Sequence, residues 1–312
     1  MSTERQMRAT AWALAVAALL TAAPLWADRL DEGSASTMGP SGDDPPSTIT
    51  SGNVAASASD SPAVDDVAVD LAEPDFVVIT LPTTLRLPRH RAAFRVTHRF
   101  DRPLGEGDFG DLAADFFGFD AGGVIGLEFR FGLFTGTDIG VYRTSERTVR
   151  FFAQQELVRQ GDFPFGLALT AGVEGLDNFQ EEYSPQVGLV LSRKLGTQGA
   201  LYAVPFWVGN TNLSLSGGDE STVALGLGAR VRVRESVSLV AEWTPRILGF
   251  KGNRGGREAG DRGSFGIEKR VGGHSFQLNF SSDLGTTPAE AARGRQGADG
   301  WFIGFNISRK FY

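Results

Sequence analysis

The sequence predicts an all-β protein, a transmembrane antiparallel up-and-down β-barrel of about 12 strands. Three observations lead to this fold. Beyond residue 76 the chain divides into segments in which apolar residues recur at every second position. The alternate positions are rich in glycine and in charged residues of both signs, which a barrel lumen accommodates and lipid does not. The last segment, from Trp301 to Tyr312, alternates in the same way and ends on aromatic residues.

The N-terminus predicts export. Residues 1–27 have the pattern of a signal peptide, because Arg5 and Arg8 precede an apolar run and cleavage is expected after Ala27. The run is shorter than the roughly 18 residues of a spanning helix; a membrane anchor is the alternative. Residues 28–75 are rich in Ser, Ala, Asp and Pro, so they predict a disordered acidic tail that serves as a spacer or binds an unidentified partner.

Residues 76–312 are the predicted barrel domain. Its expected strands are 92–100, 122–131, 137–144, 147–158, 163–174, 184–194, 199–209, 221–233, 236–246, 262–271, 274–281 and 300–311. Apart from the short link 145–146, short and long connections alternate along the chain. Outer-membrane barrels keep their short turns in the periplasm, so both termini are expected there.

The register of these strands predicts which charged residues face the lumen. In segment 221–233, for example, Leu225 and Leu227 share one face, while Gly226, Gly228 and Arg230 share the other. The same register predicts the following lumen-lining set: Arg95, Arg99, Glu128, Arg130, Arg150, Glu156, Arg230, Arg232, Glu242, Glu268 and Arg270. Basic residues are in excess, which favours either a pore with a mild anion preference or a lumen filled by ion pairs.

Aromatic residues mark the ends of several predicted strands. Trp207, Trp243 and Trp301 suit the two interfaces of a membrane. Phe311 and Tyr312 are expected to carry the signal that the barrel-assembly machinery reads at the C-terminus.

Two segments outside the strands are unusually apolar. Residues 76–81 are too apolar for the tail, and Pro82 and Pro88 make the region too proline-rich for a spanning strand. We expect a plug in the lumen or across its periplasmic mouth, or else a simple segment before the barrel. The loop 101–121 contains four phenylalanines, so it is expected to fold back over or into the barrel. The basic loop 251–257 suits contact with lipopolysaccharide or plain flexibility.

Composition excludes several other functions. The chain has no cysteine, which rules out disulfides and thiolate metal sites. The net charge of −7 is concentrated in the tail, and nothing indicates a nucleic-acid surface. The histidines are His90, His98 and His274; their positions do not converge on one serine or metal, so no catalytic residue, metal site or cofactor is predicted.

Several phrases of the sequence together resemble the membrane-bound β-barrel family known as domain of unknown function 5777. They are Thr-His-Arg-Phe at 97–100, Phe-Gly-Phe-Asp-Ala at 117–121, Gly-Leu-Glu-Phe at 126–129, Leu-Gly-Leu-Gly-Ala-Arg at 225–230, Gly-Gly-His-Ser-Phe-Gln-Leu at 272–278 and Gly-Phe-Asn-Ile-Ser-Arg-Lys-Phe at 304–311. The resemblance implies a fold and a bacterial outer-membrane location, without a reaction.

These observations predict a monomeric outer-membrane barrel that acts as a passive channel, or porin, for small solutes. The first alternative is a non-conducting structural or docking barrel with an ion-paired lumen; an outer-membrane enzyme comes third. The expected partners are the lipid bilayer, lipopolysaccharide and the barrel-assembly machinery.

Overall fold

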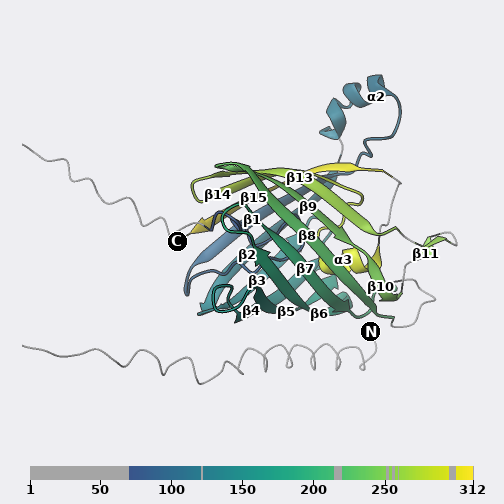
Figure 1. The fold of residues 1–312 in the computed structure, drawn as a ribbon. Helices are drawn as coiled ribbons and strands as arrows, with labels where there is room; N and C mark the ends of the chain where they lie inside the picture. Colours follow the sequence, from purple (N-terminus) through teal and green to yellow (C-terminus); the bar gives the residue numbers. More distant parts are fainter. Residues whose placement is uncertain are drawn as a thin grey trace, which may run out of the picture.

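In the computed structural model, one antiparallel sheet closes into a barrel. The structure describes residues 70–120, 122–213, 220–250, 260–294 and 300–311, together with the backbone of 253–254 and 257–258. The predicted signal peptide, the predicted tail up to residue 69, and Tyr312 lie outside these residues. Thirteen strands follow one another around the sheet, and pairing of β8 with β9 closes it. Because β10 continues β9 beyond Pro245, the wall has twelve strands, as predicted (Figure 1).

The strands occupy nearly the predicted ranges. They are β1 (Ala92–Phe100), β2 (Gly123–Phe134), β3 (Thr137–Thr144), β4 (Val149–Val158), β5 (Gly166–Leu176), β6 (Glu181–Lys194), β7 (Gly199–Val208), β8 (Thr222–Arg234), β9 (Val237–Thr244), β10 (Arg246–Gly249), β13 (Arg262–Val271), β14 (His274–Ser281) and β15 (Phe302–Phe311). A separate small sheet pairs β11 (Asn253–Arg254) with β12 (Arg257–Glu258).

The last strand seals the barrel against the first. β15 pairs with β1 from Ala92 opposite Phe311 to Arg99 opposite Gly304. Every wall strand therefore has a neighbour on each side, which leaves no open sheet edge in the lipid. The tight turn between β13 and β14 contains Gly272 at a φ of 55°, a left-handed conformation that glycine adopts without steric cost.

The two ends of the barrel differ in their connections. The short-turn end carries the links 135–136, 235–236 and 272–273, the start of β1 and the end of β15. The long-loop end carries the connections 101–122, 209–221, 250–261 and 282–301, besides two shorter links.

The outer face of the barrel is an apolar surface. Along β2, Leu127 is 46 % exposed and Phe129 is 48 % exposed, whereas their neighbours Glu128 and Arg130 are each 3 % exposed. The apolar side chains therefore point outward and the charged ones inward, the arrangement that lipid requires. Trp243 and Trp301 are exposed near the long-loop end, as expected of an interfacial belt.

The expectation that the first loop folds back over or into the barrel is wrong for its helix, although Phe119 beyond the helix packs on Phe100 of β1, with ring centroids 4.8 Å apart. The loop's helix α2 (Phe109–Ala114) and the turn η2 (Phe116–Gly118) stand clear of the wall in Figure 1, and Phe109 is 76 % exposed. The loop is locally satisfied instead. Asp108 and Asp111 form a capping box, and the rings of Phe109 and Phe117 pack edge to face.

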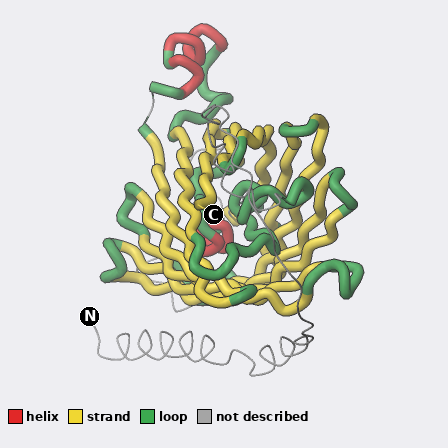
Figure 2. The backbone as a smooth tube through the Cα atoms, turned by 90° about the vertical axis from the view of Figure 1, so that its left-hand side faces the viewer, coloured by secondary structure: helices red, strands yellow, loops and turns green. Residues whose placement is uncertain are grey.

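A different connection, 282–301, supplies a helix to the interior. Figure 1 shows α3 (Pro288–Arg293) within the ring of wall strands, and Figure 2 shows helix and irregular chain inside the same outline. Among the described residues, neither α2 nor α3 has the length and the apolar run of a membrane-crossing helix.

Candidate functional site

The lumen contains the segment 70–91, which we call the plug. Its centre is a hairpin, 76–83, in which Val77 pairs with Pro82 and the Thr83 amide donates to the Phe76 carbonyl at 2.9 Å. Val78 and Ile79 are fully buried. Of the alternatives for residues 76–81, the plug is therefore the one observed, and a simple segment outside the barrel is wrong. The plug begins near Lys194 and ends at β1, so both of its ends lie at the short-turn end.

The predicted boundary between tail and barrel at residue 75 needs correction. Glu73 and Asp75 are buried, and Asp70 forms an ion pair with Lys194 of β6 at 2.8 Å. Residues 70–75 thus belong to the packed structure, because the lumen supplies partners for their charges. Burial raises the pKa of the Glu73 carboxyl, and the backbone hydrogen bond from Thr84 opposes that shift.

The tip of the hairpin surrounds the carboxylate of Glu242 on β9. The backbone amides of Ile79, Thr80 and Leu81 donate to Glu242 Oε2 at 3.2, 3.0 and 3.0 Å. The Thr80 hydroxyl donates to Oε1 at 2.5 Å. One buried carboxylate thereby satisfies three backbone donors that have no strand partner, in bonds strengthened by its charge.

Other wall side chains donate to the carbonyls of the hairpin. Arg230 donates to the Val77 carbonyl at 2.9 Å, and Asn306 to the Ile79 carbonyl at 2.9 Å. Gln277 and Gln154 donate in the same way to Val78 and Thr83, each at 2.6 Å. The hairpin is therefore held by side chains from several strands, and the carbonyls of Val77, Val78, Ile79 and Thr83 are paired even though no strand lies beside it.

A stack of alternating rings and guanidinium groups joins the plug to the wall. The Arg130 guanidinium lies 4.8 Å from the ring centroid of Phe76 in the plug and 4.8 Å from that of Phe152 on β4. The Arg150 guanidinium lies 4.6 Å from the centroid of the same Phe152 ring. Desolvated cation–π contacts of this kind contribute about 2 kcal/mol each.

Helix α3 fills the opposite part of the lumen. Arg293 donates to Glu174 at 2.9 Å and to the Ser184 hydroxyl at 2.8 Å. Its alanines Ala289 and Ala292 pack in an apolar cluster with the wall, formed by Ala168, Val190, Val204, Phe206, Val208 and Ala224. Where these alanines pack, the wall formed by β5 to β8 is apolar.

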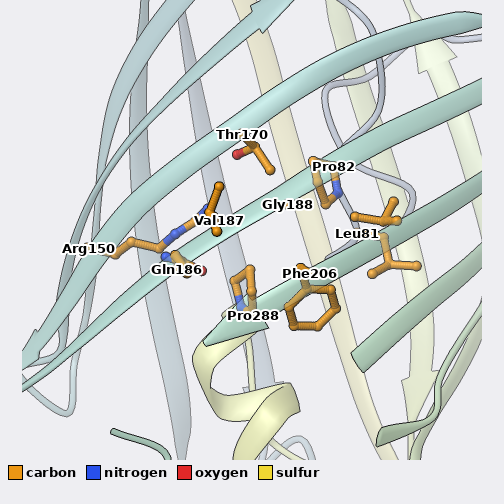
Figure 3. A pocket seen from close by; sticks show the side chains of 10 residues that line it. Leu81, Pro82, Arg150, Thr170, Gln186, Val187, Gly188, Phe206 and Pro288 are labelled. Atoms are coloured by element: carbon orange, nitrogen blue, oxygen red, sulfur yellow. The ribbon is translucent and has the colours of Figure 1, made fainter. Parts of the chain in front are cut away.

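Little space remains between the plug and α3. The cavity of Figure 3 lies between Leu81 and Pro82 of the plug, Pro288 of α3, and the wall residues Arg150 and Phe206. Its volume is about 20 Å³, which is room for about one water molecule. The plug and α3 therefore pack closely against each other at this level.

The structure places the predicted lumen residues in two groups. Seven are buried inside the barrel: Arg95, Arg99, Glu128, Arg130, Arg230, Glu242 and Glu268. Arg150, Glu156, Arg232 and Arg270 are partly buried. Ion pairs join Arg95 to Glu128 at 2.5 Å and Arg230 to Glu268 at 2.9 Å. Glu156 pairs with the exposed Arg159, and Arg232 donates to Thr197, so these two lie at the short-turn rim.

Sequence reasoning left some interior residues unnamed. Asp138 accepts from Arg130 at 3.4 Å and from the Leu87 amide at 3.2 Å; Gln154 and Gln277 bind the hairpin. In the sequence, these three residues alternate with outward-facing neighbours, and this alternation could have predicted that they face the lumen. Phe311 is exposed on the outer face, and its partner in the predicted assembly signal, Tyr312, lies outside the described residues.

The three histidines do not come together. His98 on β1 stacks on Phe305 near the long-loop end, whereas His274 begins β14 at the short-turn end beside Arg309, and His90 is exposed before β1. Among the described residues, no cluster of three or more histidine and acidic side chains has the geometry to hold a metal ion.

A closed antiparallel sheet with an apolar outer face and a polar, occupied interior defines a membrane β-barrel. The chain belongs to the Membrane bound beta barrel domain family (DUF5777), which it matches over residues 75–311.

The chain is similar at a low level to several solved structures. The NanC porin is 8 % identical with a TM-score of 0.44, covering 71 % of this chain and 99 % of that one. The COG4313 outer membrane channel from Pseudomonas putida F1 is 12 % identical with a TM-score of 0.43, covering 73 % and 98 %. Omp33 from Acinetobacter baumannii is 8 % identical with a TM-score of 0.39, covering 71 % and 98 %. No curated protein sequence matches the chain.

Proposed function

We propose that this protein is an outer-membrane channel for small solutes, with a preference for anions, and that the plug closes it in the conformation described. In this proposal the short-turn end faces the periplasm. The observation that carries it is the polar joint between plug and wall: the hairpin is held by hydrogen bonds to side chains, not by membership of the sheet.

Such a joint allows the plug to leave without breaking the barrel. The named wall strands do not include residues 70–91; of the plug, His90 and Arg91 make backbone hydrogen bonds to Gly132 of β2, so the plug stays tethered there when its hairpin leaves. Water that enters with the leaving segment can replace hydrogen bonds to side chains, at small net cost per bond. The chain has no cysteine, so no disulfide holds the plug in place.

The anion preference follows from the charges of the wall. Buried basic side chains on the wall strands number seven, namely Arg95, Arg99, Arg130, Arg230, Arg246, Arg262 and Lys310. The buried acidic ones number five, namely Glu128, Asp138, Glu174, Glu242 and Glu268. A lumen with surplus positive charge lowers the electrostatic barrier for anions and raises it for cations.

Planar-bilayer recording of a hairpin-shortened variant tests the proposal. Residues 77–82 are replaced by Gly-Gly, which is feasible because Phe76 and Thr83 are already hydrogen-bonded neighbours at 2.9 Å. We expect the full chain to remain mostly closed and the variant to show discrete steps, with a reversal potential in a salt gradient that indicates anion preference. A matched control replaces 109–114 of the external helix α2 by Gly-Gly, and it should behave as the full chain does.

The filled lumen also favours a second candidate, a non-conducting structural or docking barrel. A folded hairpin-shortened variant without conductance steps would establish this candidate and refute the channel. A cation preference of the variant would refute the anion assignment.

A further inference from the structure

We propose that Asp75 and Phe76 of the plug occupy a binding site for small aromatic carboxylates on the lumen wall, and that such acids are solutes of the channel. This inference rests on the proposed function and names its substrate class. In the closed state the plug acts as an internal stand-in for the solute, placing one ring and one carboxylate where a bound aromatic acid places its own.

The ring half of the site is the guanidinium of Arg130. Phe76 is 4 % exposed, and the Arg130 guanidinium lies 4.8 Å from its ring centroid and 4.8 Å from that of Phe152. Lys310 Nζ lies 5.7 Å from the Phe76 centroid. The apolar side is completed by Ala93 of β1, and Leu87 of the plug packs with Ala93 and Phe76 in one cluster. A ring that replaces Phe76 keeps the contacts to Arg130 and Lys310.

The carboxylate half of the site is on β15. Asp75 is 3 % exposed, and its Oδ2 accepts a hydrogen bond from the Ser308 hydroxyl at 2.8 Å. Its Oδ1 accepts from the backbone amide of Phe76 at 2.8 Å, which ties the carboxylate to the residue that carries the ring. Lys310, two residues from Ser308 on the same strand face, donates to the Pro74 carbonyl.

The wall residues that contact Asp75 and Phe76 stay together in the barrel when the plug leaves. Arg130 belongs to β2, Phe152 to β4, and Ser308 and Lys310 to β15, so all of them stay in the barrel when the plug leaves. Register places Ser308 opposite Arg95 and Lys310 opposite Ala93. Withdrawal of Asp75 and Phe76 therefore exposes a hydroxyl, an ammonium and a stacked guanidinium side by side, which matches the two chemical groups of an aromatic acid.

A vacated site in the full chain tests this inference. The double variant Asp75→Ala/Phe76→Ala removes the carboxylate and the ring but keeps the hairpin contacts to Glu242. Calorimetric titration with 3-phenylpropionate should show binding at least about tenfold tighter, or roughly 1.4 kcal/mol, than with either of two analogues. 3-Cyclohexylpropionate keeps the charge without an aromatic ring, and 3-phenylpropanol keeps the ring without the charge.

A conservative change at the stacked cation makes the test specific. Arg130→Lys in the same background keeps the positive charge and removes the planar stacking group, so 3-phenylpropionate should bind about tenfold more weakly. Arg232→Lys, at a partly buried cation on the short-turn rim that donates to Thr197, is the matched control and should leave the affinity unchanged. Equal affinity for all three compounds, or no loss on Arg130→Lys, overturns the inference.

If the double variant fails to fold, conductance of the unmodified chain tests the same inference. An acid that competes with Asp75 and Phe76 should raise the open fraction at millimolar concentration, whereas the two analogues should not. If the hairpin-shortened variant conducts but neither measurement distinguishes the three compounds, the substrate class is wrong and the channel stands. If that variant does not conduct although 3-phenylpropionate binds selectively, the site stands and the channel is wrong.

Discussion

Replacing Glu242 by Gln should loosen the tip of the plug by a predictable amount. Three backbone amides converge on Glu242 Oε2 at 3.0 to 3.2 Å. Hydrogen bonds to a charged acceptor contribute about 1.5–3 kcal/mol, roughly twice the value for a neutral one. Glu242→Gln keeps the volume and one carbonyl oxygen but removes the charge. A loss of about 2.3–4.5 kcal/mol over the three bonds shifts the docking equilibrium roughly 40- to 1,600-fold towards release.

Hydrogen–deuterium exchange reads this shift at the amides concerned. Protection of residues 79–81 should fall by the same factor, because these amides exchange when the hairpin leaves Glu242. The matched control is Glu174→Gln, which removes another inward-facing buried carboxylate, one that binds Arg293 of α3 and not the hairpin. The control should keep the protection of 79–81. Unchanged exchange in Glu242→Gln would refute the anchoring role of this carboxylate.

Three further predictions concern the interior and the outer face. Arg293→Ala leaves the fully buried Glu174 without its cation, so unfolding in lipid vesicles should cost about 3–5 kcal/mol less; a change below about 1 kcal/mol would contradict the pairing. Leu127→Arg places a charge on the lipid face and should destabilise the barrel by about 2–4 kcal/mol, whereas Phe109→Arg on the external α2 should have no measurable effect. Burial raises the pKa of Glu73, which faces Lys194 of β6 and Asp70; docking is therefore strongest below the ordinary carboxyl pKa and weakens as pH rises through the raised one. The open fraction should fall as pH is lowered from neutrality towards the ordinary carboxyl pKa, and Glu73→Gln should abolish that dependence; a wild-type pH response retained in Glu73→Gln would contradict the assignment.

The wall of the barrel was predictable because each strand carries its own two-residue signal. Leu127 and Glu128 alternate in sequence as they do in space, so fold class and inward-facing parity follow from local pattern alone. The same alternation predicted that Glu242 faces the lumen. Its role as the hydrogen-bond acceptor for a hairpin 161 to 163 residues away depends on closure of the whole sheet, which local pattern does not show.

The interior occupants were harder to predict because loops have no comparable periodicity. The phenylalanines of 101–121 indicated burial, yet α2 forms its own capping box and leaves Phe109 exposed. The alanines of α3 gave no such indication, although they pack on the apolar wall of β5 to β8. Small side chains such as Ala168 and Ala224 fit either a lumen or a packed contact, and only the position of α3 decides between them.

Thiol labelling inside the lumen tests the central claim, that residues 70–91 close the barrel, most directly. Thr97→Cys introduces a single thiol at an inward-facing position that is 2 % exposed, opposite Asn306, whose amide donates to the plug carbonyl of Ile79. A charged water-soluble reagent should label it slowly in the full chain and rapidly when 77–82 are replaced by Gly-Gly. Thr197→Cys, in the exposed turn after β6, should label rapidly in both. Equal rates at Thr97→Cys with and without the hairpin would show that the plug does not close the lumen.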